Sequence, residues 1–532
     1  MQGLMMDFPL TLTHFLERAG RLFPKKEIVT RTAEGVHRYT YADFHSRAHR
    51  LAHALEALGV ARGGRVGTLA WNHYRHLELY NAIPCYGAVL HTLNLRLAAD
   101  QLAYIIDHAG DEVIFADESL LPLLDPIRGR IPRVRRIVTL GEEYEALLAA
   151  APAAPYAWPN LDENAAAGMC YTSGTTGNPK GVVYSHRAIA LHNYALAMAD
   201  TLAFSERDTL LQIVPMFHAN GWGKPYAAVM CGMKIVLLGA QPQPRDLAAL
   251  IERERCTVAG GVPTIWIGLL RLLESETFDL SSVRLFIGAG SAIPRQLIAD
   301  FESRHGIRLV QLWGMTETTP VATLSVLKSG MDAWSTEERL TQRAKAGYAV
   351  AGVELRAVGE DGNELPWDGK SAGELQVRGP WLTSGYYNDE RSADAFANGW
   401  FRTGDVVTVD AEGTIQILDR TKDLVKSGGE WISSVDLENA IMAHQKVLEA
   451  CVVAVPHEKW HERPLAVVAL APQHQGQVTR EEILEFLAGR VAKWWLPYDV
   501  VFVESVPKTS VGKFNKRALR EMYPQLPPAA GS

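Results

Sequence analysis

A loop rich in hydroxyl side chains and glycines, Tyr171-Thr-Ser-Gly-Thr-Thr-Gly-Asn-Pro-Lys-Gly181, has the composition needed to hold a chain of phosphates. Its hydroxyls can donate hydrogen bonds, its glycines let backbone N–H groups approach an anion, and its lysine adds a mobile positive charge. The spacing is not that of a Walker A loop. A flexible Ser/Gly linker is the alternative, but a linker does not require Pro-Lys-Gly directly before a strand. The residues expected to hold a triphosphate are Thr172, Ser173, Gly174, Thr175, Thr176, Gly177 and Lys180.

A second set of polar residues, Trp313-Gly-Met-Thr-Glu317, follows the apolar stretch 309–312. Ligands of open α/β sheets bind at the ends of strands, so this position suits a binding site. Thr316 can hydrogen-bond a phosphate, and Glu317 can hold Mg²⁺ through oxygen. The flat face of Trp313 can stack on a purine. Taken alone, a glutamate after a strand more often marks the start of a helix, where acidic residues are favourable.

Three motifs in the second half of the chain carry charged residues that suit a nucleotide. In Gly399-Trp-Phe-Arg-Thr-Gly-Asp405, a carboxylate in a tight glycine turn can accept both hydroxyls of a ribose, although a plain β-turn aspartate is the alternative. Arg420 is a second candidate for ribose or phosphate, weighed against a surface salt bridge. Lys513 follows a glycine in the segment 507–513 and, in isolation, would be interpreted as a solvated lysine.

The spacing of apolar residues predicts the elements that position these motifs. Leu51, Leu55 and Leu58 recur at helical spacing. Short apolar runs alternate with such helical segments, which indicates parallel sheets built from βαβ units. Residues 149–159 are rich in Ala and Pro and are expected to form a surface connection. Strands of this alternating part are expected at 65–70, 87–93, 112–116, 135–140, 210–214, 234–238, 285–288 and 309–313.

The pattern changes in the last third of the chain. After about residue 345, short strands are separated by Gly and Asp, as at 373–379 and 414–418, which indicates a smaller antiparallel unit. From about residue 419 a mixed α+β pattern begins and ends in a basic segment, 508–520. No internal repeat interrupts this organisation.

Bulk composition narrows the class of protein. With 532 residues the chain is too long for one core, so at least two domains are expected. A net charge of -7 argues against nucleic acid as the main partner without excluding small anions. The five cysteines are scattered, which predicts neither a zinc site nor a disulfide framework and fits a reducing cytoplasm. The start of the chain lacks the basic residues of a signal peptide, and no apolar run is long enough to span a membrane.

Taken together and in this order, the five motifs resemble those of the adenylate-forming superfamily, which includes acyl-CoA synthetases, peptide-synthetase adenylation domains and firefly-type luciferases. The resemblance extends from about residue 39 to residue 520 and is most specific at 171–181 and 399–431. The segments most similar to bacterial medium- and long-chain fatty-acid–CoA ligases are Tyr-Ser-His-Arg at 184–187, Pro-Met-Phe-His at 215–218, His-Thr-Leu-Asn at 91–94 and Gly-Met-Thr-Glu-Thr-Thr-Pro at 314–320.

The resemblance implies an α/β fold in two domains. Residues 1–418 would form a large multi-lobed N-terminal domain with two βαβ-type sheet sub-domains and a small β sub-domain. Residues 419–532 would form a small mobile α+β domain, joined through a hinge segment at 419–424 with Asp419 at its start and Lys422 at the pivot. ATP, Mg²⁺, a carboxylic acid and CoA are the implied small molecules, with no nucleic acid and no integral membrane span. A homodimer and a peripheral attachment to the membrane stay open.

The resemblance also implies roles for single residues. The loop 173–181 would close over the β- and γ-phosphates, Thr316 would contact the α-phosphate, and Glu317 would hold Mg²⁺. Lys513 would bridge the carboxylate and the α-phosphate, and His218 would line the acyl pocket beside the reacting carboxylate. The other implied assignments are Asp405 and Arg420 for ribose, Gly290, Trp313 and Gly314 for AMP, Trp222, Ala289 and Gly314 for the acyl group, and Lys426, Gly428, Gly429 and Glu430 for the thioester step.

Three positions bear on how the carboxylic acid substrate and the adenine base would be bound. Trp313 stands where tyrosine is usual, and stacking on adenine should survive the change. Ala289 stands where many relatives carry glycine, which would narrow the acyl pocket slightly. Trp222 resembles an aromatic that gates the acyl tunnel of long-chain relatives, and the alternative is that it only packs in the core.

Adenylation brings two anions together, so its barrier is largely electrostatic, and Lys513, Mg²⁺ and the loop donors would all act there. Attack by the CoA thiol then requires AMP to be held but no longer requires Lys513, so one mobile domain could serve both steps by rotation. We therefore predict an AMP-forming fatty-acid–CoA ligase. The alternatives are a ligase for a short, thio-substituted or aryl acid, a luciferase-like oxygenase, and a non-catalytic or carrier-loading adenylation module, which the lack of a carrier domain disfavours.

Overall fold

The computed structural model describes residues 1, 3–172, 178–240, 242–421, 423–427, 430–457, 460–509 and 513–525. Several residues predicted to act in the site lie outside this description, as do the side chains of Lys426 and Glu430. The predicted site residues outside it are Ser173, Gly174, Thr175, Thr176, Gly177, Lys422, Gly428 and Gly429.

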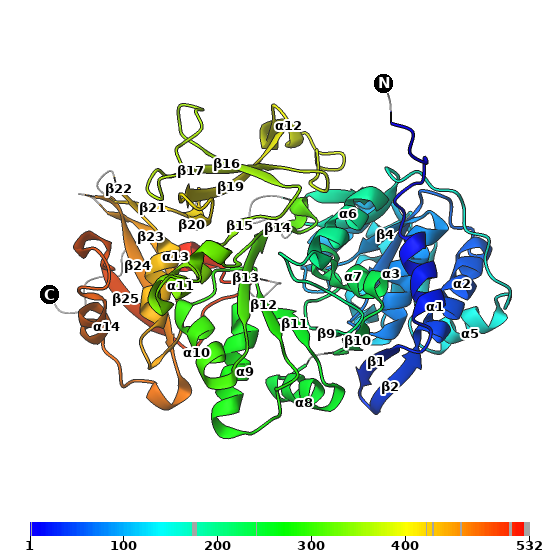
Figure 1. Ribbon diagram of the computed structural model, residues 1–532, viewed down its shortest axis with the longest axis horizontal. Coiled ribbons are helices and arrows are strands. Elements are labelled where there is room, and N and C mark those ends of the chain that lie inside the picture. Colours follow the sequence, from blue (N-terminus) through cyan, green and yellow to red (C-terminus); the bar gives the residue numbers. More distant parts are fainter. Residues whose placement is uncertain are drawn as a thin grey trace.

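A nine-stranded sheet forms the middle of the molecule (Figure 1). Its six central strands are parallel, and antiparallel partners extend it at both edges. In spatial order its strands are β15 (Tyr348–Ala349), β14 (Val321–Leu324), β13 (Leu309–Gly314), β12 (Leu285–Gly288), β11 (Val258–Gly261), β9 (Thr209–Gln212), β10 (Lys234–Leu237), β1 (Glu27–Thr32) and β2 (Gly35–Thr40).

A six-stranded sheet lies beside it, coloured blue to cyan in Figure 1. It is parallel except for its last pair, in which β7 and β8 run antiparallel. Its order is β6 (Arg136–Thr139), β5 (Asp111–Ala116), β3 (Arg65–Leu69), β4 (Val89–Thr92), β7 (Ala166–Tyr171) and β8 (Gly181–Ser185).

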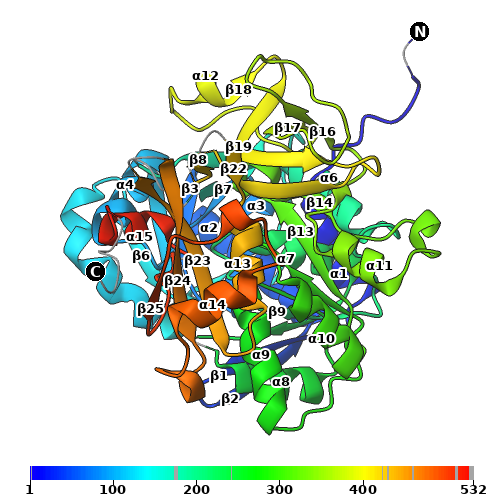
Figure 2. The same cartoon turned by 90° about the vertical axis from the view of Figure 1, so that its left-hand side faces the viewer.

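Two further sheets follow in the last third of the chain. One is entirely antiparallel and forms the yellow layer in Figure 1; it contains β16 (Glu354–Val358), β17 (Gly373–Arg378), β18 (Phe396–Ala397), β19 (Trp400–Val409) and β20 (Ile415–Arg420). The other makes up the small C-terminal domain, which faces the viewer in Figure 2. Its strands are β21 (Val425–Ser427), β22 (Glu430–Ile432), β23 (Val447–His457), β24 (His461–Leu470) and β25 (Asp499–Val503).

Helices cover the faces of these sheets. In the N-terminal part they are α1 (Thr13–Leu22), α2 (Tyr41–Ala57), α3 (Tyr74–Tyr86), α4 (Ala99–Ala109), α5 (Glu142–Ala150), α6 (His186–Ala197), α7 (Lys224–Cys231), α8 (Pro244–Glu254), α9 (Pro263–Ser275), α10 (Arg295–His305), α11 (Thr336–Arg343) and α12 (Ser392–Ala395). In the C-terminal part they are α13 (Ser434–Met442), α14 (Arg480–Leu487) and α15 (Lys516–Met522). Among the described residues, none of the helices combines the length and apolar character needed to cross a bilayer.

The C-terminal sheet shows how an apolar run encodes a two-sided core. Along β23, Val452 packs with α13 and α14, whereas Cys451 and Val453 pack on the opposite face with Leu519 of α15. Successive side chains of a strand point to opposite faces, so a continuous apolar run is buried only when both faces are covered. This arrangement fixes α15 against the C-terminal sheet.

The predicted fold class is confirmed: two mainly parallel sheets, one small antiparallel sheet and a small α+β unit. Each strand expected in the alternating part is present, with bounds that differ by a few residues. One local expectation was wrong. Asp405 lies inside strand β19, not in a tight turn, because within this strand only Gly404 takes a left-handed φ, of 71°, and the chain then continues extended. The connection 149–159 lies at the surface as expected, except that Tyr156 is buried, since its ring packs between α2 and α3.

Candidate functional site

A cavity of about 1280 Å³ lies where the carboxyl ends of the parallel strands meet. Its lining includes Val214, Leu238, Val262, Ala289 and Met315, each within two residues of the end of a strand of the nine-stranded sheet. The six-stranded sheet contributes in the same way after β3, β4 and β7. Parallel sheets place their ligand sites at this edge, because the chain leaves every strand there and enters a loop free to carry polar groups.

Every predicted site residue whose side chain is described lines this one cavity. The sequence separates the first and last of them by more than 300 positions, so only the fold brings them together. The residues are Thr172, Lys180, His218, Trp222, Ala289, Gly290, Trp313, Gly314, Thr316, Glu317, Asp405, Asp419, Arg420 and Lys513.

The pairing of β19 with β20 places Asp405 directly opposite Arg420. Nε of Arg420 lies 2.6 Å from Oδ1 of Asp405, and the indole N–H of Trp313 donates to Oδ2 at 2.9 Å. The Asp405 charge is the main reason that the pKa of Arg420 is raised. Both carboxylate oxygens therefore have fixed donors, and the carboxylate is held beside the indole at the cavity wall. The hydrogen bond through Trp313 was not foreseen, since the sequence argument used only the face of the ring.

The base of the hydroxyl-rich loop is closed by a hairpin. Tyr171 and Gly181 are partners in the β7–β8 ladder, and one step further the backbone N–H of Thr172 donates to the carbonyl of Lys180 at 2.9 Å. The N–H of Lys180 also donates to the Thr172 hydroxyl at 3.2 Å. The two ends of the loop are thus fixed at the cavity, and Nζ of Lys180 lies 4.4 Å from the centre of the Tyr386 ring.

Glu317 is buried in a short 3₁₀ turn, Thr316–Thr318, directly after β13. Its Oε1 accepts a hydrogen bond of 2.8 Å from the hydroxyl of Tyr386. Burial, together with the Glu317 charge, raises the pKa of that hydroxyl, so it stays a donor. A buried carboxylate with one oxygen oriented by a tyrosine suits Mg²⁺, whose ligands are usually oxygens and whose ligating carboxylates are usually hydrogen-bonded. Tyr386 was missed, because nothing in the sequence around it indicates chemistry.

Lys513 reaches the cavity beside Gly290. The glycine has a φ of 92°, and a Cβ atom there would lie 3.5 Å from Cε of Lys513. Burial and then the nearby Arg420 lower the pKa of Lys513 to about 8, against the opposing effect of Asp405 and Glu317. Burial and the charge of Lys513 lower the pKa of His218 to about 3. At neutral pH the site therefore combines a charged lysine with a neutral histidine.

The cavity lining also contains a group of apolar side chains, and one of them lies in an unusual backbone turn. Residues 219–223 all have left-handed φ angles, from 43° at Ala219 to 72° at Gly223. For residues with a side chain this costs about 1–2 kcal/mol each, so the surrounding structure must hold the turn in place. Trp222, in its middle, is 6% exposed, lines the cavity and also belongs to the main hydrophobic core. This apolar group, which is part of the apolar lining, consists of Ile213, Val214, Phe217, Trp222, Leu238, Val262, Ile265, Ile267 and Leu312.

The predicted hinge residue Asp419 lies next to the last residue of β20 and is linked to the C-terminal domain. Nζ of Lys516, at the start of α15, lies 3.5 Å from Oδ2 of Asp419 and 3.1 Å from Glu438. Arg520 pairs with Asp423 at 2.5 Å. Of the segment predicted for the thioester step, Lys426 lies in β21 and Glu430 in β22, at the edge of the C-terminal sheet and away from β13 in Figure 1.

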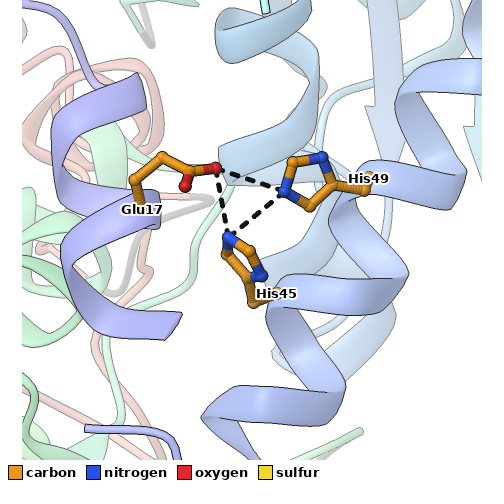
Figure 3. Close-up of side chains that lie close together, drawn as sticks. All are labelled: Glu17, His45 and His49. Atoms are coloured by element: carbon orange, nitrogen blue, oxygen red, sulfur yellow. Dashed lines mark hydrogen bonds and ion pairs between the residues drawn. The ribbon is translucent and has the colours of Figure 1, made fainter. Parts of the chain in front are cut away.

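A second cluster of potential metal ligands joins the N-terminal helices. Figure 3 shows Glu17 of α1 pointing toward His45 and His49 of α2, with Oε1 of Glu17 at 3.1 and 3.2 Å from their Nε2 atoms. A metal-bound histidine donates a hydrogen bond from its other nitrogen. Nδ1 of His49 instead accepts the backbone N–H of Tyr156 at 2.9 Å, so the proton of a neutral His49 must be on Nε2. The cluster is therefore a hydrogen-bonded junction and does not fit a metal ion.

Comparisons with known proteins agree with this geometry. Residues 16–387 match the model of the AMP-binding enzyme family, and residues 436–513 match that of the AMP-binding enzyme C-terminal domain. A long-chain-fatty-acid–CoA ligase of Thermus thermophilus is 51% identical over 530 residues, which covers 98% of this chain and 96% of the relative. A 3-methylmercaptopropionyl-CoA ligase of Ruegeria pomeroyi is 43% identical, with 98% and 99% covered.

Among solved structures, the anthranilate CoA ligase AuaEII in complex with anthranoyl-AMP superposes with a TM-score of 0.88. The alignment has 25% sequence identity and covers 97% of this chain and 98% of that one. The whole architecture, including the C-terminal domain, is thus shared with a structure that holds an acyl-adenylate.

Proposed function

Because the chain belongs to the AMP-binding enzyme family, we propose that it joins a medium- or long-chain fatty acid to coenzyme A through an acyl-adenylate. The class of reaction is the ATP-dependent, AMP-forming ligation of a carboxylic acid to CoA, with Mg²⁺ as the metal. The fatty-acid substrate is the part that goes beyond this class.

One observation carries the proposal: the lining of a single cavity combines charged side chains with a group of apolar ones. We call the part beside Lys513, Arg420 and Glu317 the charged end, and the part beside the apolar group that includes Trp222 the acyl arm. An acid whose carboxylate lies at the charged end would therefore bury its hydrocarbon chain in the acyl arm. Burial of each methylene contributes about 0.8 kcal/mol, which favours acids with longer chains as far as the arm extends.

The charged end supports the first half-reaction. A carboxylate oxygen of the acid attacks the α-phosphorus of ATP, and the bond to the pyrophosphate oxygen breaks. The Lys513 ammonium would offset the repulsion between these two anions, and the Thr316 hydroxyl would hold the α-phosphate. Neutral His218 would orient the acid carboxylate through one N–H group without adding charge. Mg²⁺, when bound at Glu317, would offset the negative charge of the phosphates.

The nucleoside would be held by the group around Asp405. With Arg420 and Trp313 fixing its two oxygens, the carboxylate keeps lone pairs for the ribose hydroxyls. Trp313 would contact the adenine, with Gly290 and Gly314 giving room for it. The hydroxyls at the base of the loop, including Thr172, together with Lys180 would face the β- and γ-phosphates.

In the second half-reaction the CoA thiolate attacks the acyl carbonyl, and AMP leaves with the electron pair of the carbon–oxygen bond. We propose that the C-terminal domain, from Asp419 onward, rotates between the two steps. The ion pairs of Lys516 and Arg520 with Asp419 and Asp423 support this, because they lie at the proposed hinge and hold α15 with Lys513 near the cavity. The hairpin that carries Lys426 and Glu430 would then move toward the acyl group.

A ligase for a short thio-substituted or aryl acid is the second candidate, favoured by the relative from Ruegeria and by the likeness to AuaEII. The deciding experiment measures pyrophosphate release and CoA consumption over straight-chain acids from propionate to palmitate, 3-methylthiopropionate and benzoate-type acids. A kcat/KM that rises with chain length beyond hexanoate supports the fatty-acid proposal. A maximum at the thio-substituted or aryl acids contradicts it.

The proposal extends to two kinds of association, the formation of a homodimer and attachment to the membrane surface. The exposed apolar side chains at the N-terminus, Leu4, Met5, Met6 and Phe8, would supply surface that either association could bury. Light scattering measures the first, and flotation with lipid vesicles measures the second.

A further inference from the structure

The wall of the acyl arm conceals a buried lysine that the mechanism does not use. Lys224 is the first residue of α7 and directly follows the left-handed turn that carries Trp222. Its side chain is 1% exposed, and Nζ has no hydrogen-bond partner among the described residues. Burial lowers the pKa of Lys224 to about 7. A buried ammonium without a partner is unfavourable, so its surroundings should offer some compensating attraction.

That attraction comes from the indole of Trp222. Nζ of Lys224 lies 4.7 Å from the centre of the Trp222 ring, within the distance of a cation–π interaction. Space for Nζ exists because residue 260 of β11 is a glycine: a Cβ atom there would lie 2.1 Å from Nζ. The lysine is thus placed over the ring by the strand next to it. Among the described residues, Trp222 lines the cavity and Lys224 does not, so the ammonium can act on the acyl arm through the indole that it contacts.

The turn itself is also tied to the sheet. The side-chain amide of Gln212, at the end of β9, donates to the carbonyls of Val214 and Gly221 at 2.7 and 3.2 Å. These bonds hold the backbone of the turn, whereas the position of the indole depends on its side-chain torsions and on its packing in the main hydrophobic core. Beside this packing, the indole has the contact of its ring face with Lys224.

We propose that Lys224 is a positioning residue that holds Trp222 in the wall of the acyl arm and thereby sets which acids fit. The inference rests on the proposed function insofar as the arm takes the hydrocarbon part of the acid. An acid that ends before Trp222 leaves the pair intact, whereas a longer acid must turn the indole away from the ammonium. A desolvated cation–π pair is worth about 2 kcal/mol, so its loss should change discrimination by about 30-fold.

The test compares kcat/KM for butyrate and dodecanoate at pH 6.5, where most Lys224 side chains are protonated. Lys224→Met keeps an unbranched side chain that is one atom shorter and removes the charge. We expect it to raise the dodecanoate-to-butyrate ratio by about 10- to 30-fold while KM for ATP changes less than threefold. Lys224→Arg keeps the cation and should hold the ratio within threefold of the wild type.

Gly260→Ala gives an independent perturbation, because the added methyl group displaces Nζ from the ring without removing the charge. It should raise the ratio in the same direction as Lys224→Met. Three results would each overturn the proposal. One is an unchanged dodecanoate-to-butyrate ratio in both Lys224→Met and Gly260→Ala, and another is an equal fall of kcat/KM for the two acids. The third is a shift of the ratio in Lys224→Arg as large as in Lys224→Met. Wild-type activity that is confined to aryl or short acids would instead refute the fatty-acid proposal. In that case the role of Lys224 is tested with the ratio of kcat/KM for a longer and a shorter acid of the class that the enzyme accepts.

Discussion

The pH dependence of adenylation tests whether the charge of Lys513 acts in the first half-reaction. Burial and the nearby Arg420 lower the pKa of Lys513 to about 8 in the free enzyme. If the ammonium form is required, kcat/KM for ATP should fall as the pH rises through that value. A single titration with this pKa leaves about 90% of the lysine charged at pH 7 and about 10% at pH 9, so the expected fall is about tenfold.

The assay follows pyrophosphate release without CoA, at limiting ATP and saturating acid. Lys513→Arg provides the matched charge control, because its guanidinium stays protonated through this range. Its rate constant should be lower but independent of pH from 7 to 9. Lys508→Arg, five residues earlier and paired with Glu449, should keep the wild-type profile. The release of AMP from a supplied acyl-adenylate by CoA should rise with pH, since the thiolate is the nucleophile.

Two results would refute this reasoning. A wild-type adenylation profile that stays flat to pH 9 would mean that the lysine charge does not act there. A fall in Lys513→Arg with the same midpoint would assign the titration to another group. If Lys513→Ala slowed both half-reactions equally, the proposal that one domain serves the two steps in two positions would also fail.

Three further predictions concern other parts of the molecule. Trp222→Ala should change the chain-length preference by at least tenfold and KM for ATP by less than threefold, whereas an unchanged preference would leave Trp222 as a core residue. Tyr386→Phe should raise the Mg²⁺ concentration needed for half-maximal pyrophosphate release by about tenfold, because Glu317 loses the donor that orients it, with Tyr387→Phe as the neighbouring control. The hydrogen bonds from His45 and His49 hold the pKa of Glu17 well below its usual range, so the ionised form adds stability above about pH 4.5 that is lost as the pH falls. Glu17→Gln should therefore lower the free energy of unfolding by about 1 kcal/mol at pH 7 and by less at pH 4. An equal difference in melting temperature between variant and wild type at the two pH values would contradict this pH dependence.

The sequence by itself determined the class of fold and the chemistry. Apolar runs alternating with amphipathic segments predicted the parallel sheets, because burial on both faces leaves a local signature in each strand. The hydroxyl-rich loop and the Trp313 to Glu317 motif were found for the same reason: their residue types and spacing are local. The motif around Asp405 was found in the same way and most of its residues line the cavity, but its conformation was not predicted, because pairing with β20 imposes an extended chain that local glycines do not predict.

Tertiary structure alone decided which side chains meet. Arg420 faces Asp405 because of strand register, and Tyr386 orients Glu317 across 69 positions of sequence, which no spacing rule connects. Lys224 read from sequence is an ordinary lysine before an apolar helix. Its burial against Trp222 follows from a left-handed turn and from a glycine in a strand of the central sheet. Residue types and local periodicity are written along the chain, whereas distances between remote side chains are set only when the sheets, helices and loops have packed together.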